Sequence, residues 1–250
     1  MKKILFAVTL IAAFSVFAMG AEIHKTAKES GNARLPGSAI SLSSPHACTL
    51  EKSHPCVYYG GDIDPNDPEY NGLSNENDLF IANSFTYNEV AAPVAAKISA
   101  AFSNNLSTYG VIDPKTATWD FRTGVSEGNG GTDIKSGDTA AEFTATGRNE
   151  FGYNEYELLT GTSVSVPKGD VFYNVTPNCT NSSDPDCTSD PRYFESDTDG
   201  LNGINSKYTV TSNNGMGPVF ESTFFGINWG SWCNDEGVAC GDGMSSGVLK

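Results

Sequence analysis

From residue 57 onward, hydrophobic and polar residues alternate along the chain with a period of two. The alternation is clearest at Ala117, Trp119 and Phe121, which polar residues separate, and it recurs at 94–102. In a β-strand, such a period buries one face and leaves the other face in water. The pattern therefore predicts a series of β-strands in the second part of the chain, and it places Ile98, Ala100 and Phe102 on one buried face.

Turn-forming residues separate these runs, for example at 113–114, 128–131 and 167–169. Short strands broken by such turns are typical of antiparallel sheets. The alanine-rich stretch 91–101 also fits a helix, but Pro93 and the alternation favour a strand. The sequence thus predicts an all-β fold: an antiparallel β-sandwich or jelly-roll-like single domain that follows a signal peptide.

The start of the chain has the pattern of an export signal. Lys2 and Lys3 precede an apolar run, and small residues at positions 18 and 20 predict cleavage before Ala21. The alternative is a membrane anchor, but this apolar run is shorter than the roughly 20 residues that cross a bilayer. We expect a bacterial, Sec-exported protein that is secreted, extracellular or periplasmic. Its predicted parts are the signal peptide 1–20, a polar leader 21–54 and a β-sandwich domain 55–250.

The chain is strongly acidic, with 15 basic and 30 acidic residues and a formal net charge of −15. Such a surface repels nucleic acid and anionic lipid and attracts cations. After the signal, no apolar run is long enough to cross a bilayer. We therefore expect that the protein has no nucleic-acid partner and that it is not an integral membrane protein. Solubility outside the cell is the simplest reason for the charge.

Six cysteines form three close pairs. They are Cys48 with Cys56, Cys179 with Cys187, and Cys233 with Cys240. An even number in an exported protein indicates disulfides, and the short polar stretches between the partners favour a bond within each pair. The first pair has an alternative, because His46 and His54 each lie two residues before a cysteine and zinc accepts this ligand set. The spacing matches no usual zinc motif, so the sequence predicts three local disulfides.

Several short motifs lie between residues 57 and 230. They are Gly72-Leu73-Ser74-Asn75-Glu76, Phe102-Ser103-Asn104-Asn105-Leu106, Trp119-Asp120-Phe121-Arg122-Thr123-Gly124 with its continuation to Thr132, the stretch from Val164 to Pro177, and Ser222-Thr223-Phe224-Phe225-Gly226. Together they resemble a group of uncharacterised exported bacterial β-sandwich proteins, often associated with surface-sorting tails of the choice-of-anchor or PEP-CTERM-like kind. The resemblance implies a fold and an extracellular location but no catalytic residues. Many such proteins have a hydrophobic sorting tail, which this sequence does not show, so the mode of surface attachment is open.

Two acidic stretches are candidate calcium sites, because calcium takes six to eight oxygen ligands. The first contributes Asp62, Asp64, Asp67, Glu69 and Asp78, and the second contributes Asp197, Asp199 and Asn202. The second stretch begins like an EF-hand loop but lacks the distal glutamate. The alternative for each is a solvated acidic loop. The cofactor that the sequence suggests is calcium.

Aromatic residues offer flat rings on which sugars can stack. Glycines and the predicted Cys233–Cys240 disulfide favour a loop around Trp229 and Trp232, which makes these two the candidate ligand-binding residues. Other candidate rings are Tyr58, Tyr59, Tyr70, Tyr87, Tyr153 and Tyr156. For most of them, core packing or the preference of β-strands for aromatic residues is the simpler reason. The partner that this pattern suggests is an extracellular glycan or an envelope component.

Catalysis has little support in the sequence. The three histidines lie in the leader, away from any candidate nucleophile. A glycosidase needs two carboxylates that face one sugar, and the candidates are Glu142, Glu150, Glu155 and Glu157. We therefore expect that the protein has no catalytic residues. We expect it to be a calcium-stabilised extracellular binding module for glycans or envelope components. The alternatives are a structural or adhesive surface protein without a small ligand and, after it, a glycosidase-like enzyme.

Overall fold

The computed structural model describes residues 48, 56–63, 72–75, 86–92, 95–107, 115–150, 153–178, 193–198, 200, 203–204, 219–221, 229–231 and 243–250. The predicted signal peptide and almost all of the leader lie outside the described residues. The strands are β1 (Cys56–Tyr59), β2 (Gly72–Ser74), β3 (Thr86–Ala92), β4 (Ala96–Ser107), β5 (Thr116–Thr123), β6 (Thr132–Glu150), β7 (Tyr153–Val166), β8 (Gly169–Pro177), β9 (Tyr193–Thr198), β10 (Val219–Glu221), β11 (Gly230–Ser231), β12 (Gly243–Met244) and β13 (Ser246–Leu249).

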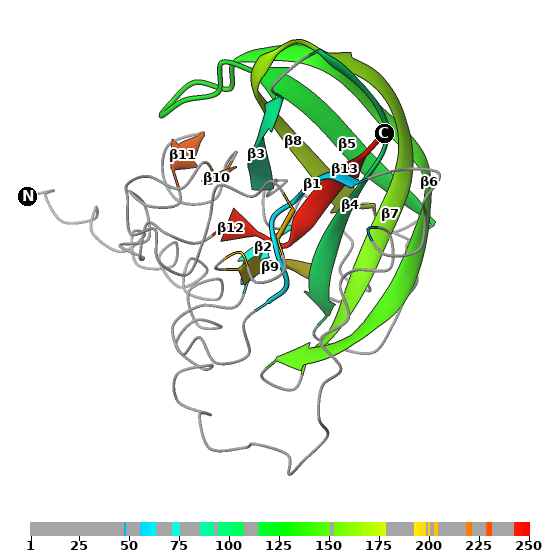
Figure 1. The fold of residues 1–250 in the computed structure, drawn as a ribbon. Coiled ribbons are helices and arrows are strands. Elements are labelled where there is room, and N and C mark those ends of the chain that lie inside the picture. The colour runs from blue at the N-terminus through cyan, green and yellow to red at the C-terminus, as the bar shows by residue number, and fades with distance from the viewer. Residues whose placement is uncertain are drawn as a thin grey trace, which may run out of the picture.

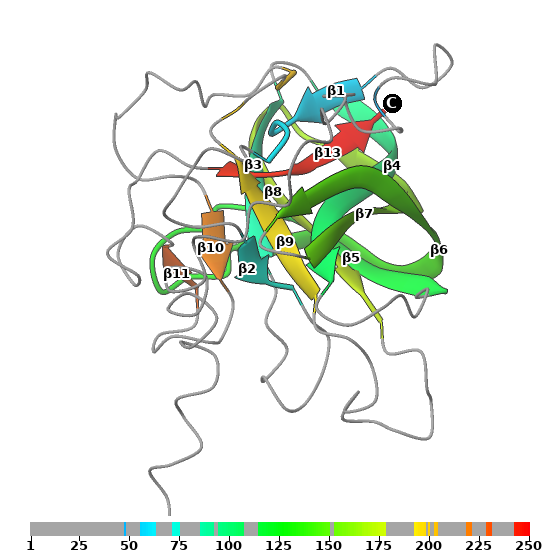
Figure 2. The ribbon, with the colours of Figure 1, turned by 90° about the horizontal axis from the view of Figure 1, so that it is seen from below.

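These strands form one antiparallel sheet. Its main path runs β1-β13-β4-β7-β6-β5-β8-β3-β10-β11, and β9 joins β4, β2 and β12 beside this path. The sheet curls into a half-barrel, as Figures 1 and 2 show. The all-β antiparallel class is therefore confirmed. The described strands hydrogen-bond in one continuous sheet, so the two separate layers of a sandwich stay a prediction.

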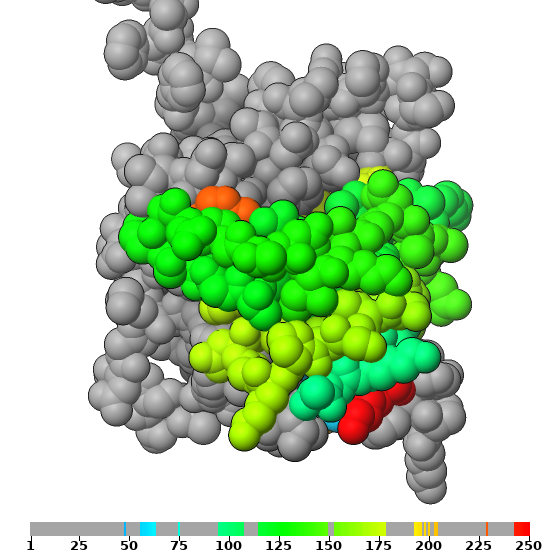
Figure 3. All heavy atoms as spheres, turned by 90° about the horizontal axis from the view of Figure 1, so that it is seen from above, coloured from blue at the N-terminus to red at the C-terminus, as the bar shows by residue number. Residues whose placement is uncertain are grey.

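Strand β6 is long enough to pair with β5 along its first half and with β7 along its second half, and so it spans the curved part of the sheet. Its first half pairs with β5, from Thr116↔Ala140 to Thr123↔Thr132, and its second half pairs with β7, beginning at Ala141↔Thr160. Figure 3 shows the outer side of this curve, where β6, β7, β4 and β13 lie side by side. Because one long strand belongs to both halves, the two halves of the sheet face each other across the core.

The main core fills the concave side. Trp119 and Phe121 of β5 and Tyr173 of β8 pack against residues of β4 and β7, among them Leu158. The rings of Phe121 and Tyr173 stack with centroids 5.8 Å apart. The buried members are Tyr58, Ile98, Ala101, Ala117, Trp119, Phe121, Leu158, Val164, Val166, Val171, Tyr173, Val175 and Val248. The inward alternation predicted at 117–121 is confirmed.

Both faces of β4 are buried, and this corrects one prediction. The pairing of β4 with β7 shifts between Ile98 and Ala100. Ile98 and Ala101 face the main core, whereas Phe102 packs with Tyr59 on the opposite face. The prediction that Ile98, Ala100 and Phe102 share one buried face is wrong, because a bulge moves the following residues to the other side of a strand. The strand prediction for 96–101 is confirmed.

The opposite face of the sheet holds a smaller core. Tyr59, Phe102 and Leu249 are its buried members, and Cys48 and Cys56 pack against it. Cys48 and Cys56 form a disulfide, so the local pairing predicted for the first pair is confirmed and these thiols are not zinc ligands. Within the described residues, no helix is long and apolar enough to cross a membrane.

The two later cysteine pairs differ from the first in that the structure does not describe them. Cys179 and Cys187 follow β8, and Cys233 and Cys240 lie between β11 and β12 in the sequence. All four cysteines lie outside the described residues. The local bonds Cys179–Cys187 and Cys233–Cys240 therefore stay predictions, and one of the three predicted disulfides is confirmed.

Candidate functional site

A cluster of buried charged groups lies on the face of the sheet opposite the main core. Nη1 of Arg148 donates to Oδ1 of Asp62 at 2.8 Å, and Nε of Arg148 donates to Oε2 of Glu155. The hydroxyl of Tyr59 donates to the same Asp62 oxygen at 2.5 Å. All four residues are buried, and Thr146 also donates to Oε2 of Glu155 at 2.7 Å. This charge cluster joins the segment after β1 to the end of β6 and the start of β7.

The local backbone explains how Arg148 reaches this position. Gly147 adopts a φ of 81°, which favours glycine, and the pairing of β6 with β7 is irregular between Ala145 and Asn149. On β7, Glu155 lies three residues before the core residue Leu158, so strand alternation puts its side chain on the opposite face. The bulge and the strand alternation therefore bring the two side chains together on the face that Asp62 approaches.

Burial and the neighbouring charges act in opposite directions on the ionisable groups of the charge cluster. Burial by itself lowers the pKa of Arg148, but Glu155, Tyr59 and Asp62 outweigh it and hold that pKa above its ordinary value. Burial raises the pKa of Tyr59 well above its ordinary value, and Arg148 opposes this rise only in part. Arg148 is thus a permanent cation between two carboxylates, and Tyr59 is a neutral hydrogen-bond donor.

We expect stability to fall steeply above pH 10. Burial raises the pKa of both Tyr59 and Tyr173 well above the ordinary value of 10.0. These hydroxyls therefore ionise in the unfolded chain before they ionise in the folded protein. The stability that they contribute is fully present below pH 10 and is lost as the pH rises toward the native pKa, by up to about 1.4 kcal/mol per pH unit for each tyrosine. Urea denaturation at pH 9, 10 and 11 measures this slope, and Tyr173→Phe should reduce it. An equal slope in wild type and Tyr173→Phe would contradict the prediction.

The described parts of the two acidic stretches meet at Asp62 and Thr198, beside the charge cluster. The hydroxyl of Thr198 donates to the main-chain carbonyl of Asp62 at 2.6 Å and accepts from the backbone N–H of Gly200 at 3.0 Å. Tyr59 and Ile204 exchange two backbone hydrogen bonds of 2.9 Å. A Cβ on Gly61 would lie 2.6 Å from the Thr198 hydroxyl, so glycine permits the close approach. We call this junction of residues 59–63 with Thr198, Gly200 and residues 203–204 the acidic corner.

The structure describes only two of the predicted metal ligands, Asp62 and Asp197. The carboxylate of Asp62 bonds to Arg148 and Tyr59 instead of standing open to solvent. The backbone of Asp197 lies in β9, opposite Met244. The remaining candidates, Asp64, Asp67, Glu69, Asp78, Asp199 and Asn202, lie outside the described residues. Within the described part of the chain, no group of three or more His, Cys, Asp or Glu side chains could hold a metal ion.

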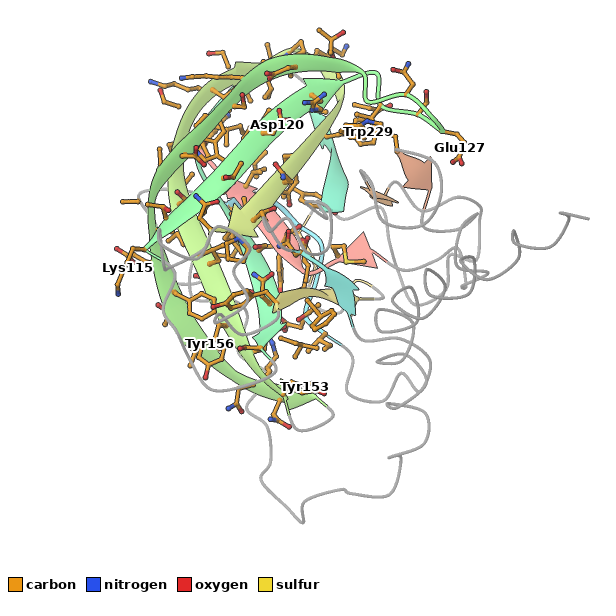
Figure 4. The ribbon with its side chains drawn as sticks, turned by 180° about the vertical axis from the view of Figure 1, so that it is seen from behind. Lys115, Asp120, Glu127, Tyr153, Tyr156 and Trp229 are labelled. Atoms are coloured by element: carbon orange, nitrogen blue, oxygen red, sulfur yellow. A yellow bond between two sulfur atoms is a disulfide. The ribbon has the colours of Figure 1, made fainter. Side chains whose placement is uncertain are left out.

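Trp229 lies at the rim of the half-barrel, beside the hairpin that joins β5 to β6 (Figure 4). The guanidinium of Arg122 lies 5.0 Å from its ring centroid, and Asp120 and the Gly130 carbonyl hold that guanidinium in place. The half-buried ring packs with Val125 and Phe172. A Cβ on Gly130 would lie 2.4 Å from the indole, so only glycine fits there. Trp229 has a φ of 67°, which is strained for this residue type.

The other candidate residues are spread over the fold. Tyr58 and Tyr59 are buried, whereas Tyr153 and Tyr156 are partly exposed, with Tyr156 on the concave side (Figure 4). Tyr87 lies in β3, and Tyr70 and Trp232 lie outside the described residues. Of the candidate glycosidase acids, Glu142 is exposed, Glu155 and Glu157 are buried, and Glu150 ends β6. The pairing of Glu142 with Leu159 puts its side chain on the same face as Glu157.

Sequence reasoning missed Arg148 as a functional residue. It is buried and bonds to carboxylates from two other parts of the chain, one of them 86 positions away. The local signal was Gly147 in the middle of a polar strand, which is typical of a bulge. Sequence reasoning also missed an aromatic cluster. The ring centroid of Phe143 lies 4.8 Å from that of Tyr156 and 5.8 Å from that of Tyr193.

No protein-family model matches the sequence, and no curated protein matches it. The resemblance to exported bacterial β-sandwich proteins therefore stays a prediction.

Proposed function

We propose that this protein is an exported, non-catalytic binding module, stabilised by calcium, whose ligand is an extracellular glycan or an envelope component. The Cys48–Cys56 disulfide supports export, because disulfides persist in oxidising compartments. The buried state of Glu155 and its pairing with Arg148 support a non-catalytic role, because an acid that is engaged in this way cannot approach a sugar.

The acidic corner is the observation that carries the calcium role. The Thr198 hydroxyl bonds to the carbonyl of Asp62 at 2.6 Å, so both acidic stretches start from neighbouring backbone positions. Calcium takes six to eight oxygen ligands, and the first stretch contributes five carboxylates while the second contributes two carboxylates and one amide. We infer that residues from both stretches share one ion and that calcium therefore joins segments that are far apart in the sequence.

Calcium should raise the melting temperature of the mature protein. An ion at 100 times its Kd stabilises the folded state by about 2.7 kcal/mol, which corresponds to about 5–11 °C in a chain of this size. Differential scanning calorimetry in calcium chloride and in EDTA measures the shift, with magnesium chloride as the control for ionic strength. Equal melting temperatures in calcium and in EDTA would remove calcium from the proposal.

Trp229 supports the glycan role. It is partly exposed, and strain of the kind that its backbone carries is concentrated at functional sites. Affinity chromatography on a panel of immobilised polysaccharides tests this role. We expect the wild type to be retained on at least one column, Trp229→Ala to lose most of that retention and Trp229→Phe to keep part of it.

Tyr153→Ala is the matched control, because it removes another partly exposed ring, at the start of β7. It should leave retention unchanged. Loss of retention in Tyr153→Ala alone would place the ligand at the other end of the half-barrel. No retention on any column, together with self-association in sedimentation, would favour a structural or adhesive surface protein.

A further inference from the structure

We propose that the ligand of the Trp229 site is an uncharged glycan and that Asp120 is the residue that determines this preference. The inference rests on the proposed glycan role, because it concerns the charge that the same site accepts. Asp120 and Arg122 belong to β5, and the guanidinium of Arg122 lies over the indole of Trp229 at the rim of the half-barrel (Figure 4).

The hairpin that joins β5 to β6 holds Trp229 by its main chain as well as by its ring. The N–H of Gly128 donates to the Trp229 carbonyl at 3.1 Å, and the guanidinium of Arg122 lies 5.0 Å from the ring centroid. Nη1 of Arg122 also donates to the Gly130 carbonyl at 3.1 Å, so the cation and the indole are fixed to the same hairpin. A ligand that stacks at this ring therefore meets the charge of Arg122 and of its partner.

Asp120 is the partner that neutralises this cation. Its Oδ2 accepts from Nε of Arg122 at 2.5 Å, and the side chains of Arg122 and Asp120 are 24% and 8% exposed. Water screens such a close and little-exposed carboxylate only weakly, so the pair presents almost no net positive charge to a ligand. In the sequence from Thr116 to Gly131, Arg122 is the one cation, and the acids are Asp120 and Glu127.

These charges favour a ligand without carboxylates. An acidic sugar would bring a second carboxylate to a guanidinium that Asp120 already pairs, and like charges at short distance weaken binding. The exposed acid Glu127 on the same hairpin adds to this repulsion. An uncharged sugar meets no such cost, and its apolar face can pack on an aromatic ring. The charges described around Trp229 thus suit an uncharged pyranose chain better than an acidic one.

Paired polysaccharide columns test the inference with the mature protein. Each neutral column, carrying a β-glucan, a xylan or a dextran, is matched by one that carries the same polysaccharide after partial carboxymethylation. In about 0.15 M salt the Debye length is about 8 Å, which limits the contribution of the net charge of the whole chain. On a column pair that retains the wild type, we expect the Kd from frontal elution to be about tenfold lower for the neutral form.

Three variants separate the role of Asp120 from other effects of charge. Asp120→Asn keeps an oxygen acceptor for Arg122 but removes the negative charge, so it should reduce the ratio of the two Kd values to about threefold or less. Arg122→Gln leaves Asp120 without its cation, so it should increase the ratio, and it serves if Asp120→Asn does not fold. Glu142→Gln, the same loss of one negative charge at an exposed position of β6, should leave the ratio unchanged. Because the ratio is taken within one protein, a smaller folded fraction does not alter it.

The outcomes separate this inference from the proposed function. A wild type that no column retains, neutral or carboxymethylated, overturns the glycan role and with it this inference. Retention that is equal on both forms, or stronger on the carboxymethylated one, overturns the uncharged ligand and leaves the glycan role standing. A neutral preference that Asp120→Asn, or Arg122→Gln in its place, leaves unchanged overturns the role of Asp120. An equal reduction in Glu142→Gln also overturns it, because the effect is then one of net charge.

Discussion

Replacement of Arg148 by methionine should lower the free energy of unfolding by about 3–5 kcal/mol, because it leaves Asp62 and Glu155 buried without their shared cation. Both carboxylates are fully buried, and each bonds directly to the guanidinium. Urea denaturation of the mature protein at neutral pH measures the loss. A change of this size is a large fraction of the roughly 5–15 kcal/mol that holds a typical domain folded.

Two variants separate the loss of the ion pair from other effects of the substitution. Lys97→Met removes an exposed cation from β4 and should change stability by less than about 0.5 kcal/mol. The triple variant Asp62→Asn, Arg148→Met, Glu155→Gln removes all three charges and should recover part of the loss, because no uncompensated charge then stays buried. A triple variant less stable than Arg148→Met would show that the hydrogen bonds matter more than the charge.

The strands could be predicted from the sequence where one face alone is buried. Ala117, Trp119 and Phe121 all face the main core, and the residues between them are the polar Thr118 and Asp120, so the structure confirms the prediction. At β4 the same reasoning chose the wrong inward set. Both faces of that strand are covered, and a bulge after Ile98 exchanges them. A period of two cannot reveal a bulge when small or apolar residues occupy both faces.

The candidate site could be predicted only in part, because long-range pairing decides it. The composition of the two acidic stretches was visible in the sequence, but their meeting at Thr198 joins residues 136 positions apart. The partner of Asp62 was hidden for the same reason, because a lone arginine in a polar strand usually points to solvent. Trp229 was found because glycines surround it, yet the need for Gly130 beneath its ring follows only from the folded hairpin.

Truncation of Phe121 to alanine should also cost about 3–5 kcal/mol, since it opens a cavity in the middle of the main core. The side chain is completely buried. Its ring stacks on Tyr173 with centroids 5.8 Å apart and meets the ring of Trp119 edge-on at 6.0 Å. The melting temperature should fall by about 6–20 °C. Phe121→Leu, which keeps most of the volume, should cost less than about 1.5 kcal/mol.

Phe143→Ala is the matched control for this cavity. Phe143 makes comparable ring contacts with Tyr156 and Tyr193, but it is only partly buried. Water can fill part of the space that its ring leaves, so its removal should cost clearly less than that of Phe121. Calorimetry of both variants in the same buffer gives the comparison. Equal losses of stability in Phe143→Ala and Phe121→Ala would contradict the prediction, because the partly buried ring would then contribute as much as the fully buried one.

The position of Phe121 also predicts which function survives its truncation. Strand β8 is buried on both faces: Tyr173 faces the main core with Phe121, and Phe172 packs with Trp229 on the other face. Phe121→Ala should therefore lower global stability while retention on a polysaccharide column persists at temperatures well below melting. Val125→Ala, which removes a contact of Trp229, should do the reverse. Loss of both properties in Phe121→Ala would show that the rim depends on the core through β8.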